Sequence, residues 1–112
     1  MNSIKLVECS DSVIARGQVF RVPASWPYES IVDFMVVDIP DDSFGHSLVV
    51  ASGNKSGLVL VHLPLESCAS EEHGISREWV ISNWEKWIYP DCSVEDVYLF
   101  DSIEVPTELT TR

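Results

Sequence analysis

The segment Gly53–Gly57 has the composition of a phosphate-binding loop, which would hold a nucleotide through backbone N–H groups and a lysine. Such a loop needs a glycine directly before the lysine, a second glycine five residues earlier, and a helix that follows. Here Asn54 precedes Lys55, Val49 stands at the upstream position, and an apolar run typical of a strand begins at Leu58. We therefore interpret the segment as a connection between two strands, and expect no nucleotide and no other cofactor.

The three histidines His46, His62 and His73 are candidate metal ligands, but none is spaced as a pair on one helix. We expect no metal, although a site assembled from distant positions stays open. His62 follows two leucines on one face of a predicted strand, so we expect a hydrogen-bonded, partly buried side chain. Cys68 lies five residues from His73 in a polar stretch, which is weak evidence for a thiol nucleophile and its base. We expect no catalytic residues.

The other two cysteines, Cys9 and Cys92, are expected to be small packing residues. The count of three is odd and no C-x-x-C pair occurs, so we expect reduced thiols.

Asp33 shares a strand face with Ile31 and Met35. An acid at such a position must find a partner or shift its pKa. We expect a buried pair with Arg16 or Arg21, or a position at a sheet edge in water. A catalytic role would need a second polar group, which the sequence does not identify.

Aromatic and acidic residues are the candidates for recognition. Trp79 lies outside the apolar arc of its predicted helix, and tryptophan is enriched among interface hot spots. The alternative is a tryptophan that covers the edge of the sheet, and Trp26 and Tyr28 pose the same alternative. The predicted partner-binding residues are Trp79, Asp91, Glu95 and Asp96, with Asp41, Asp42 and Glu71 as a second acidic edge.

One helix is expected between Ser76, a good N-cap, and Pro90, with Glu78 favourably placed in its first turn. Five residues fall within one arc of about 120°, the usual width of a core-facing stripe: Val80, Ile81, Trp84, Trp87 and Ile88.

The remaining pattern predicts strands. Both faces of Ile31–Ile39 are mostly apolar, so this strand should be central. The other expected strands are Ile4–Val7 at an edge, Arg16–Pro23, the hairpin Ser47–Ala51 with Leu58–Leu63, and Ser93–Phe100. The fold class is therefore α+β, a mainly antiparallel sheet of about five to six strands covered by one α-helix in the C-terminal half. We expect a single domain, residues 1–112, with a frayed tail at about 107–112.

The formal net charge is -11 over 112 residues, and eleven acids against three bases follow from Glu66 onward. A surface of this sign repels nucleic acid and anionic lipid and attracts basic proteins, although excess acid also serves solubility. Neither a membrane span nor a signal peptide is apparent, so we expect a cytoplasmic protein.

Tryptophans and glycines recur in a pattern over roughly Leu6–Tyr98. The pattern includes His73–Ile75, Glu78–Trp79, Asn83–Trp84, Lys86–Pro90 and Val94–Tyr98, and upstream Arg16–Pro23, Trp26–Pro27, Ser52–Gly53 and Gly57–Leu58. It resembles the immunity protein 45 family of bacterial polymorphic toxin systems. The resemblance implies a cytosolic antidote, without a cofactor, that binds a toxin domain and blocks its active site or substrate path.

The leading hypothesis is thus a non-enzymatic inhibitor of a cognate, basic toxin protein. A second hypothesis is a small-ligand-binding or regulatory module with an aromatic pocket lined by Trp26 and His62. A third is an enzyme of unrecognised type, which would require convergent titratable groups in a cleft.

Overall fold

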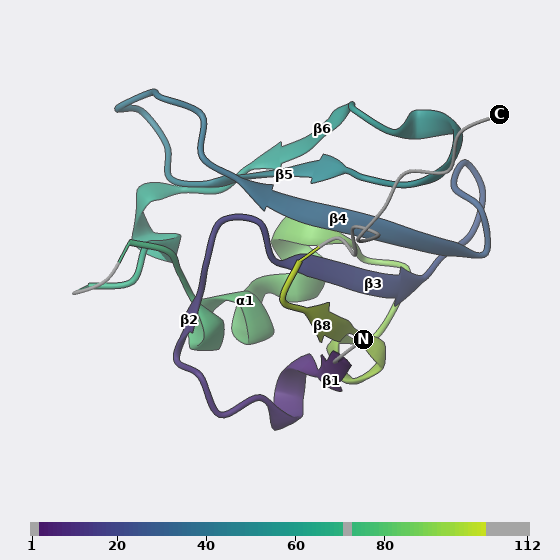
Figure 1. Ribbon diagram of the computed structural model, residues 1–112, viewed down its shortest axis with the longest axis horizontal. Helices are drawn as coiled ribbons and strands as arrows, with labels where there is room; N and C mark the ends of the chain where they lie inside the picture. The colour runs from purple at the N-terminus through teal and green to yellow at the C-terminus, as the bar shows by residue number, and fades with distance from the viewer. Residues whose placement is uncertain (1–2, 71–72, 103–112) are drawn as a thin grey trace, which may run out of the picture.

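Six antiparallel strands form the main sheet, in a computed structural model that describes residues 3–70 and 73–102 (Figure 1). The predicted tail at 107–112 and Glu71 lie outside the described residues. The strands, in spatial order, are β1 (Ser3–Lys5), β8 (Tyr98–Phe100), β3 (Val19–Pro23), β4 (Ile31–Val37), β5 (Ser47–Val50) and β6 (Val59–His62). The C-terminal half supplies the helix α1 (Arg77–Asn83), so the predicted α+β class is confirmed.

The predicted central strand is confirmed as β4, which pairs with β3 and β5. Its alternate residues Val32, Phe34 and Val36 are fully buried on the face that meets the helix. On the opposite face, Asp33 accepts two hydrogen bonds from Arg21, at 2.8 and 2.9 Å. The two residues are directly paired across the strands, so the expected pairing with Arg21 is confirmed and Asp33 has a structural role.

The predicted helix begins as expected, because the Ser76 hydroxyl accepts a hydrogen bond from the N–H of Trp79 at 3.3 Å. The prediction that one α-helix continues as far as Pro90 was wrong. The α-helix ends at Asn83, whose side-chain amide donates to the carbonyl of Trp79 at 2.9 Å and so disturbs the backbone ladder. A π-helical segment (Trp84–Ile88) follows, closed by a bond from the N–H of Tyr89 to the carbonyl of Trp84.

The expected core stripe is confirmed in its main members. Trp84 is 1% exposed and its ring meets that of Phe20 edge-on, with centroids 5.5 Å apart. Val80 and Ile88 are also buried, whereas Trp87 is only partly covered. Among the described residues no helix is long and apolar enough to cross a bilayer.

The hairpin prediction is confirmed: β5 and β6 pair antiparallel, and a 3-10 turn (Gly53–Lys55) connects them. The final strand is shorter than predicted, because the Ser93 hydroxyl accepts from the N–H of Glu95 and starts a 3-10 turn (Val94–Asp96) instead. Only Tyr98–Phe100 joins the sheet, between β1 and β3. The predicted edge strand is confirmed as β1, and a 3-10 turn (Leu6–Glu8) takes its second half.

A second, two-stranded sheet was not predicted. It pairs β2 (Val13–Ile14) with β7 (Ile75–Ser76), and an isolated bridge joins Cys68 to Ile75. A fourth 3-10 turn (Leu65–Ser67) precedes that bridge. Strands of two residues carry no measurable periodicity, which is why the sequence pattern missed them.

Gly74 lets these strands approach closely, and Gly74→Ala should lower the free energy of unfolding by about 1–3 kcal/mol. A Cβ at this position would lie 2.5 Å from Cγ1 of Val13 and 2.7 Å from the carbonyl oxygen of Ile14, and a backbone atom cannot turn away. Urea unfolding measures the loss. Ser70→Ala, at an exposed site in the same region, should stay within about 0.5 kcal/mol of the parent. A Gly74→Ala protein as stable as the parent would show that β2 and β7 are not tightly packed.

Candidate functional site

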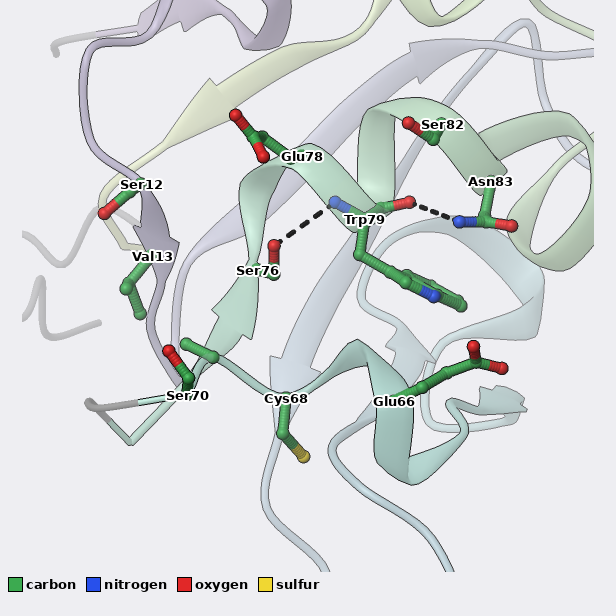
Figure 2. Close-up of a pocket in the computed structure, with 11 residues that line it drawn as sticks. Ser12, Val13, Glu66, Cys68, Ser70, Ser76, Glu78, Trp79, Ser82 and Asn83 are labelled. Atoms are coloured by element: carbon green, nitrogen blue, oxygen red, sulfur yellow. Dashed lines mark hydrogen bonds between the residues drawn. The ribbon is translucent and has the colours of Figure 1, made fainter.

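A surface cleft of about 560 Å³ opens between α1 and the chain that follows the Leu65–Ser67 turn (Figure 2). We call it the Trp79 cleft. It is lined by Ser12, Val13, Glu66, Cys68, Ala69, Ser70, Ser76, Glu78, Trp79, Ser82 and Asn83.

Trp79 is half-buried, and its ring lies along the cleft, between the helix and the turn that carries Glu66 (Figure 2). The ring also packs against Trp87, with centroids 5.9 Å apart. Its backbone N–H is held by Ser76 and its carbonyl by Asn83, so the side chain starts from a fixed position. Part of a large, rigid ring is therefore available at the surface without further ordering.

Arg77 connects α1 to the N-terminal segment that lines one side of the cleft. Its guanidinium donates to the carbonyls of Leu6 and Val7, at 3.1 and 2.7 Å, and its backbone N–H donates to the carbonyl of Ser12 at 3.0 Å. These bonds hold Ser12 and Val13 opposite the first turn of α1.

Two carboxylates, Glu66 and Glu78, lie on the cleft, and none of its described lining residues is Lys or Arg. The sequence pattern did not assign either acid to the contact surface. Glu66 belongs to the polar stretch before the helix and Glu78 to its first turn, so only the fold brings them to Trp79.

A second depression, of about 340 Å³, shares Cys68 and Ala69 with the Trp79 cleft, so the two adjoin. We call it the His46 hollow. The predicted acids Asp41 and Asp42 lie on it, and its described lining again contains no Lys or Arg. The full lining is Asp38, Ile39, Pro40, Asp41, Asp42, Phe44, Gly45, His46, Cys68, Ala69, His73 and Gly74.

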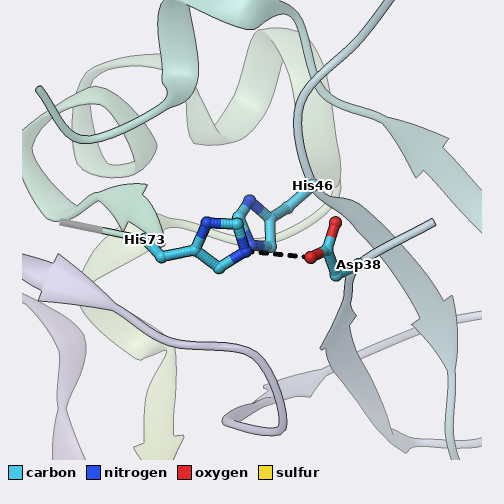
Figure 3. A group of neighbouring side chains, drawn as sticks. All are labelled: Asp38, His46 and His73. Atoms are coloured by element: carbon cyan, nitrogen blue, oxygen red, sulfur yellow. Dashed lines mark hydrogen bonds and ion pairs between the residues drawn. The ribbon is translucent and has the colours of Figure 1, made fainter. Parts of the chain in front are cut away.

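Three of these residues, Asp38, His46 and His73, converge from three separate segments (Figure 3). Nε2 of His73 lies 2.9 Å from Oδ2 of Asp38, and the two imidazole rings meet edge-on at 5.2 Å. Burial lowers the pKa of His46, and the hydrogen bond to His73 lowers the pKa of Asp38. The sequence did not point to this group, because 35 residues separate Asp38 from His73.

The other predicted contact residues lie elsewhere. Asp91, Glu95 and Asp96 are exposed on the chain that follows the π-helical segment. Asp96 lines a different, apolar depression, which includes Ile31 and Tyr98. The fold therefore gives Trp79 and the Asp41–Asp42 pair adjoining positions but places Asp96 on another depression.

The aromatic pocket of the second hypothesis does not form around its proposed residues. Trp26 is 89% exposed, so its ring cannot line a closed cavity. Nδ1 of His62 lies 2.7 Å from the Ser47 hydroxyl, which confirms the expected hydrogen bond, but His62 is exposed and stacks on Phe44. The expectation that His62 is partly buried was wrong.

Cys68 is exposed, whereas Cys9 and Cys92 are buried as expected, and all three thiols are free. Burial also raises the pKa of the Cys92 thiol, which disfavours its reactive thiolate. We expect iodoacetamide to add one fast adduct to the native protein and three after denaturation, as intact mass spectrometry would record. The Cys68→Ser protein should add none quickly, and a fast adduct on Cys92 would contradict its burial.

Comparison with known proteins places the chain in one family. No curated protein and no solved structure matches it. Residues 6–99 match the family model described as Immunity protein 45. The match includes the cleft, the hollow and the main sheet except β1 and Phe100. The chain belongs to the immunity protein 45 family.

Proposed function

We propose that this immunity protein binds a cognate bacterial toxin domain and neutralises it by covering its active site, with no catalysis of its own. The observation that carries this proposal is the acidic surface formed by the Trp79 cleft and the His46 hollow. Five carboxylates lie on these two adjoining depressions, and their described linings contain no Lys or Arg. The acids are Glu66, Glu78, Asp38, Asp41 and Asp42.

Such a surface suits a basic polypeptide. Carboxylates of one sign, in a chain of net charge -11, attract a cationic partner over distances beyond direct contact and speed its association. The half-buried indole of Trp79 then offers apolar area at a low entropic cost, as anchors in tight interfaces do. The partner is thus a toxin domain with a basic active-site surface, met in the cytoplasm of the cell that makes the immunity protein.

A second acidic surface is also proposed to act in toxin binding. It consists of Asp91, Glu95 and Asp96. These carboxylates are exposed, and they could extend the attractive field or contact the toxin directly. Their separation from the two depressions makes the two surfaces distinguishable by mutation.

The test is co-expression with the toxin domain encoded beside this chain's gene, in bacteria that the toxin alone kills. We expect survival, and a one-to-one complex by size-exclusion chromatography of the co-expressed proteins. Calorimetry on the purified pair then gives the affinity. Killing that persists at equal expression, with no complex at micromolar concentrations, would overturn the proposed function.

A further inference from the structure

Polar residues lie just beyond the paired ends of β4 and β5, on the face of the sheet that otherwise packs into the core. A second site could form there. In the ladder between β4 and β5, Val37 pairs with Ser47, so the next pair in register is Asp38 with His46. Side chains alternate between faces, so Asp38 continues the buried row of Val36. The backbone of His46 is fixed on its other side by a bond from the N–H of Leu63 to the carbonyl of His46.

The third residue is His73, which directly precedes Gly74 and strand β7 of the small two-stranded sheet. One potential ligand atom from each of Asp38, His46 and His73 lies within 4.8 Å of the other two. Figure 3 shows the three side chains meeting at one point from different parts of the fold. Two imidazoles and a carboxylate are a common ligand set for zinc.

An independent observation concerns His46. The residue is only 4% exposed, and within the described part of the chain its buried Nε2 has no hydrogen-bond partner. A buried polar nitrogen without a partner costs free energy and is rare in folded proteins.

We propose that Asp38, His46 and His73 form a Zn²⁺ site. Three protein ligands leave one of the four tetrahedral positions to water. Two imidazole nitrogens favour Zn²⁺ over Mg²⁺ or Ca²⁺, which prefer oxygen ligands. Bonds of about 2.0–2.2 Å would draw the ligand atoms together and replace the hydrogen bond between His73 and Asp38.

The surroundings suit a cation. Asp41 and Asp42 lie on the same hollow, and they add negative charge beyond the ligands themselves. Arg16 opposes the site, since its charge acts on both Asp38 and His46. The side chain of His73 is 77% exposed, so it can move to complete the coordination without disturbing the core.

Isothermal titration of the tag-free protein with Zn²⁺ tests the proposal. We expect one equivalent to bind at micromolar protein, and His73→Ala and Asp38→Asn each to weaken binding at least about tenfold. The matched control is His62→Ala, which removes the third histidine from an exposed position outside the ligand group and should leave the affinity unchanged. Cys68→Ser should also bind normally, because the thiol is not among the proposed ligands.

Because His46 is buried, His46→Ala could unfold, so His73→Ala and Asp38→Asn are the deciding variants. Co²⁺ gives a second readout, since the parent should develop visible absorption bands that His73→Ala lacks. Absence of Zn²⁺ binding would overturn the proposal. Equal loss in His62→Ala and His73→Ala, or loss in Cys68→Ser, would do the same. Asp38 belongs both to this site and to the proposed toxin-binding surface, but Zn²⁺ binding is measured without the toxin, so either proposal can fail alone.

Discussion

We expect Trp79→Ala to weaken binding of the cognate toxin by about 30- to 1000-fold, the range of a hot-spot truncation worth about 2–4 kcal/mol. The backbone N–H and carbonyl of Trp79 are both hydrogen-bonded, and its half-buried ring lies in a cleft that two carboxylates also line. Truncation removes the apolar area that a toxin side chain would cover and leaves a gap that water refills. Calorimetry with the purified toxin domain measures the change.

Trp26→Ala is the matched control. It removes the same side chain from a site that is 89% exposed and outside both depressions, so affinity should stay within about twofold of the parent. Because Trp79 also packs on Trp87, the thermal unfolding of each variant must be measured alongside its affinity. A Trp79→Ala protein that stays folded and binds normally would remove the cleft from the contact surface.

Local patterns were sufficient for most of the fold. Apolar residues on both faces predicted β4 as central, and it lies between β3 and β5. The Ser76 cap placed the start of α1. The break at Asn83 could not be read from the pattern, since it depends on one side chain that competes for the carbonyl of Trp79. The pairing of β2 with β7 depends on the absence of a Cβ at Gly74, which is a tertiary contact.

The candidate site was less predictable than the fold, because its members are distant in sequence. Trp79 could be singled out, since helical periodicity places it off the apolar arc. Glu66 reaches the cleft only through the turn that folds back under α1. Similarly, Asp38 and His46 become neighbours through strand register, and His73 joins them across two layers.

Charge reversal at the cleft should abolish protection. Glu66→Lys with Glu78→Lys places two cations where the proposed basic toxin surface would dock, and like charges in contact cost several kcal/mol. The double variant should therefore fail to rescue growth, and its affinity should fall by about 100-fold or more. Glu78 lies in the first turn of α1, so its reversal also costs about 0.3–1 kcal/mol of stability, which unfolding curves would report.

The matched control is a second double variant, Asp91→Lys with Glu95→Lys. It changes the net charge by the same amount as the Glu66 and Glu78 double variant, but on a different surface. At physiological salt the Debye length is about 8 Å, so charges outside the contact act weakly and mainly on the association rate. We expect this variant to protect cells and to slow association by less than about tenfold. If instead it abolishes protection while the Glu66 and Glu78 variant rescues growth, the toxin docks on the chain after the π-helical segment. Trp79 would then be a packing residue. The proposal that an acidic surface binds a basic toxin would still hold, but the contact surface would be a different one.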